Sequence, residues 1–183
     1  MTMPVLFAHL VTSGLGPIVD GIAHVLMSPD DLLPVLGVGV LAGQNGPRAA
    51  RAALFALPAS WLAGGAMGWW TAQPVFSALP ATGLFIVLGI LVAVASRLPT
   101  SAIAFLSGTL GVLHGWPNGA DMASNGRDPI ALVGVAGVIF VLTALSSARV
   151  VSLTAPWSRV AVRVAGSWIA AIGLLMLGWA LRG

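Results

Sequence analysis

The chain of 183 residues lacks cysteine, lysine, glutamate and tyrosine, and only 7% of its residues are charged. Without cysteine there are no disulfide bridges, thiolate metal sites or cysteine nucleophiles. Without lysine and glutamate, the Gly-Lys-Ser/Thr phosphate loop and the His-Glu-x-x-His zinc motif are both absent. No serine stands in a nucleophile-elbow context either, so the sequence does not indicate an enzyme or any catalytic residue.

The chain is instead rich in long stretches of apolar residues. Hydrophobic residues make up 58% of it, whereas a soluble domain carries roughly a quarter charged residues. A membrane-spanning helix needs about 20 apolar residues, and six stretches reach or approach that length: 31–43 extended at either end, 51–70, 74–96, 100–114, 129–148 and 160–181. Short connections rich in Gly, Pro and Asn separate them. We therefore predict one domain over residues 1–183, an all-α polytopic transmembrane helix bundle of six spans.

A further apolar segment precedes the first predicted span. Residues 4–19 are interrupted by Gly and Pro and are short for a span, so they predict a re-entrant or seventh helix. The segment carries no basic start and no small-residue cleavage pattern, and we expect it to be retained rather than removed as a signal peptide.

The basic residues predict the orientation in the membrane. Six of the eight arginines fall on alternate connections, which predicts that those connections are cytoplasmic and that the chain is a multi-pass protein of a bacterial inner membrane. The arginines form no basic stripe with interleaved aromatics, so lipid rather than nucleic acid is the expected partner. With tyrosine absent, the interfacial belt is expected from tryptophan, namely Trp61, Trp69, Trp70, Trp116, Trp157, Trp168 and Trp179.

Two clusters combine histidine with aspartate at the same spacing. An aspartate follows His24 by seven residues at Asp31, and another follows His114 by seven residues at Asp121. We place both clusters on connections at the non-cytoplasmic face, where two imidazoles and up to three carboxylates, Asp30 included, would converge. Imidazole with carboxylate suits nickel, cobalt, zinc or copper. Alternatively, Asp30 caps a helix and each histidine bonds a loop carbonyl.

The same residues carry a family resemblance. Residues 21–24 (GIAH) with 30–34 (DDLLP), and then residues 113–121 (LHGWPNGAD), fall on the two motifs of the HupE/UreJ family. The sequence resembles this family of small membrane proteins over most of its length. It departs from the pattern at Asp31, which replaces a histidine, and at Trp116 and Asn118, where the family often has histidines.

This resemblance implies uptake of a divalent metal ion, nickel or cobalt, with zinc or copper not excluded by the ligands. The metal site would consist of His24, Asp30, Asp31, His114 and Asp121. The leading hypothesis is thus a metal permease with its site at the non-cytoplasmic face. The alternative is a non-transporting accessory subunit of a larger membrane complex, and a third reading is a protein that contacts heme or quinone.

Overall fold

The computed structural model describes residues 14–73 and 78–182, which form seven helices and no strand. The helices are α1 Pro17–Met27, α2 Pro29–Gln44, α3 Pro47–Thr71, α4 Ala78–Ala93, α5 Thr100–Ser124, α6 Ala131–Val151 and α7 Pro156–Ala180. The all-helical prediction is confirmed for this part of the chain. Most of the predicted N-terminal helix, residues 4–13, lies outside the described residues.

Proline determines where several of these helices begin. It occupies the first turn of α1, α2, α3 and α7, where its fixed φ and missing N–H suit the start of a helix. Pro29 also disfavours helical backbone at the preceding residue, and Ser28 is accordingly extended, at φ −101° and ψ 97°. As a result α1 and α2 are separate helices that meet at an angle of 79°.

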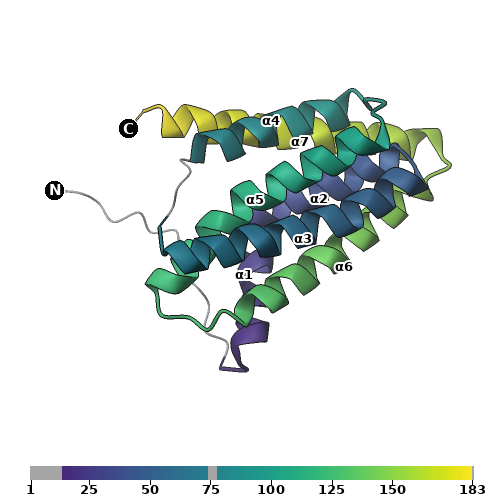
Figure 1. Cartoon of the computed structure of the whole chain (residues 1–183). Coiled ribbons are helices and arrows are strands. Elements are labelled where there is room, and N and C mark those ends of the chain that lie inside the picture. The colour runs from purple at the N-terminus through teal and green to yellow at the C-terminus, as the bar shows by residue number, and fades with distance from the viewer. Residues whose placement is uncertain (1–13, 74–77, 183) are drawn as a thin grey trace.

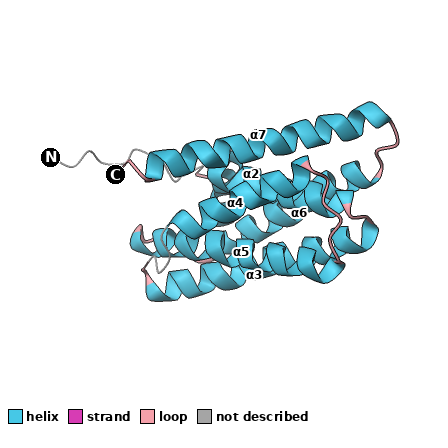
Figure 2. Ribbon diagram, turned by 90° about the horizontal axis from the view of Figure 1, so that it is seen from above, coloured by secondary structure: helices cyan, strands magenta, loops and turns pink. Residues whose placement is uncertain are grey.

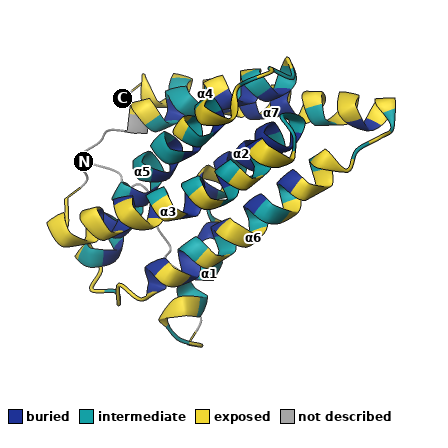
Figure 3. Ribbon diagram, turned by 45° about the vertical axis from the view of Figure 1, so that its right-hand side comes forward, coloured by how far each residue is buried: buried dark blue, intermediate teal, exposed yellow. Residues whose placement is uncertain are grey.

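The helices pack in two groups (Figures 1 and 2). One group contains α1, α2, α3, α5 and α6, with α3 and α5 in the most extensive contact. Helices α4 and α7 lie side by side against this group as an outer pair. The buried faces turn inward toward a common core (Figure 3), whose largest fully buried side chains include Trp61, Leu41, Leu57, Leu88, Ile103, Leu110 and Ile139.

Two of the helices in the described ranges, α6 and α7, are by themselves long and apolar enough to cross a membrane. The bent pair α1 and α2 would be a third span if it crosses as one broken helix. The predicted six spans are therefore not confirmed. The described apolar part of α4, Leu79–Ala93, is short. Helix α3 carries two arginines and α5 an aspartate, and both contain proline and many small or polar residues.

The arginines of the alternate connections gather at one end of the bundle. Helix α2 finishes here, and Arg97 Nη1 donates to the carbonyl of its last residue, Gln44, over 3.2 Å. Helix α4 finishes at the same end of the bundle, and Arg163 Nε donates to the carbonyl of its last residue, Ala93, over 2.8 Å. At the opposite end Arg127 Nη1 lies 3.8 Å from Asp20 Oδ2.

The tryptophans follow the predicted belt only in part. Trp157 and Trp179 are exposed near the two ends of α7, about 33 Å apart at 1.5 Å per residue, which matches a hydrocarbon core of about 30 Å. Trp61 contradicts the prediction because it is completely buried in the core, with 0% exposure.

Candidate functional site

The break between α1 and α2 brings the first histidine to a carboxylate. His24 lies in the last turn of α1 and Asp31 in the first turn of α2. Since the chain turns sharply at Ser28, His24 Nε2 comes to 3.4 Å from Asp31 Oδ2. The contact does not have the geometry of a hydrogen bond, and His24 Nε2 is otherwise buried without a partner.

Helix α5 supplies the other partners of this carboxylate. His114 and Asn118 are one turn apart on α5 and share a face. His114 Nδ1 lies 3.1 Å from Asp31 Oδ1, and Asn118 Nδ2 donates to Asp31 Oδ2 over 2.9 Å. The structure thus brings both histidines onto one carboxylate from opposite halves of the chain.

Asp31 is only 3% exposed, and a carboxylate so far from water needs hydrogen-bond partners or a counter-charge. The ion pairs found for it among the described residues are with the two histidines alone. An ionised carboxylate only accepts hydrogen bonds, so the proton of His114 belongs on Nδ1. In the neutral ring the lone pair is then on Nε2, which is buried and has no hydrogen-bond partner.

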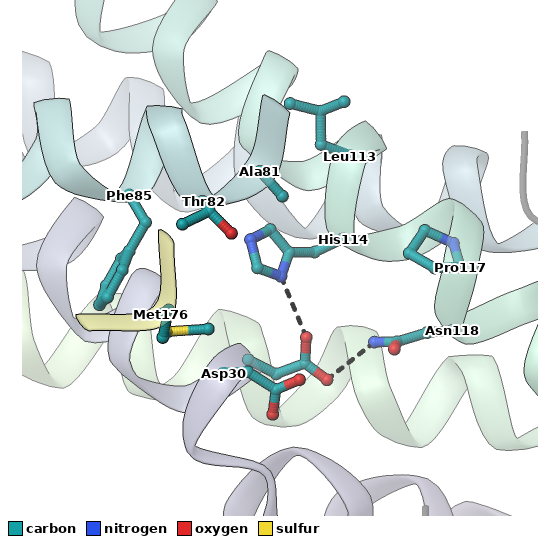
Figure 4. A pocket seen from close by; sticks show the side chains of 10 residues that line it. Asp30, Ala81, Thr82, Phe85, Leu113, His114, Pro117, Asn118 and Met176 are labelled. Atoms are coloured by element: carbon teal, nitrogen blue, oxygen red, sulfur yellow. Dashed lines mark hydrogen bonds and ion pairs between the residues drawn. The ribbon is translucent and has the colours of Figure 1, made fainter. Parts of the chain in front are cut away.

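A cavity of about 290 Å³ adjoins this cluster (Figure 4). It lies between the outer pair and the main group, and its lining comes from α2, α4, α5 and α7: Asp30, Asp31, Ala81, Thr82, Phe85, Leu113, His114, Pro117, Asn118 and Met176. Asp30 is exposed, in contrast to its neighbour Asp31. In Figure 4 the second ring nitrogen of His114 lies on the side of Thr82, away from Asp31.

The second cluster does not lie on a connection, which corrects the prediction. Helix α5 continues through Pro117 and ends only at Ser124, so His114 lies well inside the helix, about 15 Å from its end. The segment from Asp20 to Asp31 is likewise helical apart from the break. Within the bundle Asp31 is buried, and His24 and His114 are largely buried beside it.

Asp121 lies apart from the other predicted ligands. It is two turns beyond His114 on the same helix, about 10.5 Å along the axis. Its Oδ1 accepts a hydrogen bond of 3.1 Å from Asn125 Nδ2, and its carbonyl accepts bonds from Ser124 and Asn125. Asp121 therefore helps to end α5.

Nowhere in residues 14–73 and 78–182 do three or more His or Asp side chains converge in the arrangement of a metal centre. The predicted residues divide into three environments instead. His24 and His114 both contact Asp31, Asp30 faces the cavity, and Asp121 lies further along α5. In this state a cation would meet one exposed carboxylate and one unpartnered imidazole nitrogen rather than a complete ligand set.

Sequence reasoning did not assign three neighbours to the site: Asn118, Thr82 and Trp61, the last of which was expected at the membrane interface. Asn118 was noted only as a departure from the family motif, although its position four residues after His114 places both on one helical face. Trp61 has its ring centroid 5.3 Å from that of His114, at an interplanar angle of 28°. Its spacing from Gly64, Gly65 and Gly68 could have placed it on the packing face of α3.

Fold and site define the class of protein first: an all-helical membrane protein with a histidine–aspartate cluster buried at a helix break. The model of the HupE / UreJ protein family matches residues 1–176, nearly the whole chain, and the chain belongs to this family. A search of curated proteins and a search of solved structures each returned no match.

Proposed function

We propose that this protein is a permease for a divalent transition-metal cation, nickel or cobalt as its two motifs imply, in a bacterial inner membrane. The observation that carries the proposal is the pairing of His114 Nδ1 with the buried Asp31 carboxylate beside a cavity. Metal-binding histidines commonly donate their other ring N–H to a carboxylate, which fixes the ring and its tautomer. His114 has this arrangement, and its free nitrogen is the one that would bind the cargo.

The helix break supports transport in particular. Secondary transporters typically bind their cargo where a spanning helix is interrupted, because the ends of the two half-helices present backbone groups and side chains inside the membrane. Here α1 and α2 are interrupted at Ser28, and His24 and Asp31 lie on the two sides of the interruption. Asp30 and Asp31 together supply negative charge for a cation.

A small ligand set is compatible with passage. Asp30 and His114 would bind the cargo at the cavity, and water would complete its coordination. A site that releases its ion must bind weakly or exchange ligands, as in channels. The sequence has no ATP-binding element, so the driving force would be the membrane potential, worth about 2.3 kcal/mol per charge per 100 mV, or a partner protein.

The orientation follows from the arginines. The six that gather at one end would face the cytoplasm by the positive-inside rule. The cavity lies toward the other end, near the start of α2 and the last turns of α7, so the cargo would enter it from the non-cytoplasmic side.

Uptake of labelled nickel and cobalt into proteoliposomes tests the proposal. We expect the wild-type protein to raise the uptake rate over empty vesicles. The His24→Ala/His114→Ala double variant and Asp30→Asn should each reduce that rate at least tenfold. Asp128→Asn, which alters an exposed carboxylate outside the cavity lining, is the matched control and should transport normally.

Competition with zinc and copper in the same assay would define the selectivity. Uptake no faster than in empty vesicles would reject the permease, as would unchanged uptake by a correctly folded double variant. Either result would favour the accessory-subunit alternative.

A further inference from the structure

Trp61 occupies an unusual position for a tryptophan in a membrane protein. It is completely buried in α3, and its indole stacks on the ring of His114 with centroids 5.3 Å apart and planes at 28°. Its Nε1 has no hydrogen-bond partner. The indole therefore acts on its surroundings through its ring face and not through its N–H group.

Glycines next to His114 bring the two helices close enough for this stacking. Gly111 and Gly115 stand three residues before and one residue after His114. A Cβ at Gly111 would come to 2.7 Å from the carbonyl oxygen of Leu57 and 2.9 Å from the backbone nitrogen of Trp61. A Cβ at Gly115 would overlap the Trp61 carbonyl. The backbones of α3 and α5 thus meet directly beside the imidazole.

The imidazole of His114 is consequently held by two different contacts. Asp31 accepts the hydrogen bond at Nδ1 and fixes the tautomer. The indole lies against one face of the imidazole and limits the rotation of that ring. The imidazole also borders the cavity, and Nε2 is the ring nitrogen left to bind a ligand.

We propose that Trp61 is the positioning residue for His114 and holds Nε2 in the orientation that binds the metal cargo. The proposal rests on the proposed function, since it assumes that His114 is a ligand. The side chain acts through its ring, so an aromatic replacement should retain the effect and an aliphatic one should not.

Cobalt(II) binding to the purified full-length protein tests this role, because the visible d–d bands report the geometry of the ligands. Trp61→Phe should bind cobalt within about threefold of the wild-type affinity and show the same bands. Trp61→Leu should bind at least tenfold more weakly, with altered bands. Trp168→Leu changes an exposed tryptophan of α7 and is the matched control that should leave both unchanged.

A second measurement does not depend on metal. In ¹⁵N-histidine NMR spectra of the metal-free protein, we expect wild type and Trp61→Phe to show His114 as the single tautomer protonated on Nδ1, and Trp61→Leu to show mixed tautomers. Trp61→Met fills the space without a ring face and replaces Trp61→Leu should that variant not fold.

The outcomes separate the two proposals. If wild type binds neither cobalt nor nickel, the proposed function fails, and the NMR spectra alone decide whether Trp61 orients His114. If wild type binds cobalt and a folded aliphatic variant shows the same affinity, bands and tautomer with only a lower melting temperature, Trp61 is a packing residue and the positioning role is refuted.

Discussion

Replacing Gly115 by alanine should destabilise the protein, while the same change at Gly108 should not. Both glycines lie in α5, so both variants gain the same intrinsic helix preference, about 1 kcal/mol. Nothing lies within 4 Å of a Cβ at Gly108. At Gly115 the new carbon would overlap the Trp61 carbonyl and come to 3.0 Å from the Trp61 Cα. These are backbone atoms, so the two helices must separate.

The size of the effect follows from this comparison. Overpacking a tight contact costs about 1–3 kcal/mol, and because the helix preference cancels between the variants, their stabilities should differ by that amount. For a chain of this size each 1 kcal/mol changes the melting temperature by about 2–4 °C. Thermal unfolding in one detergent, followed by circular dichroism, measures the difference. Equal melting temperatures for Gly115→Ala and Gly108→Ala would show that α3 and α5 are not in backbone contact.

Other residues give equally definite expectations. Asp31→Ala should lower the free energy of unfolding by about 1–3 kcal/mol for each buried donor left without an acceptor. Asp30→Ala, which changes an exposed carboxylate, should alter it by less than about 0.5 kcal/mol. Equal effects of the two variants in unfolding experiments would contradict the burial of Asp31 against the two histidines. Thr143 is fully buried with an unpartnered hydroxyl, so Thr143→Val should raise stability by about 1 kcal/mol; a fall would reveal a bond to that hydroxyl. In intact cells an impermeant maleimide should label Ser124→Cys and not Ser152→Cys, because these exposed serines lie at opposite ends of the bundle; the reverse pattern would invert the topology.

Apolar length and turn residues predicted the six helices from α2 to α7, because a run of apolar residues between Gly, Pro and Asn has few other ways to satisfy its backbone in a membrane. The same rules failed at the end of α5. Asn118 and Gly119 fall in the predicted connection after residue 114, where such residues favour a turn, yet the helix continues through them. A Cβ at Gly119 would overlap the carbonyl of Gly65, which shows that this glycine serves the contact with α3. Tertiary packing thus outweighs the local preference for a turn.

The site was predicted to a similar extent. The equal spacing within the two clusters and the family motifs pointed to His24, Asp31 and His114, and these residues meet. The spacing could not show that His114 bonds Asp31 rather than Asp121, because that choice depends on how α5 lies against α2. Nor could it show that Trp61 covers the imidazole, since its position in the middle of the run 51–70 does not determine which helix it faces.

The cavity lies between the main group of helices and the outer pair. The contact between these two groups differs in kind from a contact within the main group. Helices α3 and α5 meet backbone to backbone through glycine, whereas the outer pair reaches α2 through side chains such as Leu88, which contacts Gly37. Side chains can change rotamer, but touching backbones have no such freedom. Any widening of the cavity would therefore displace α4 and α7 and leave the stacked rings of Trp61 and His114 in place.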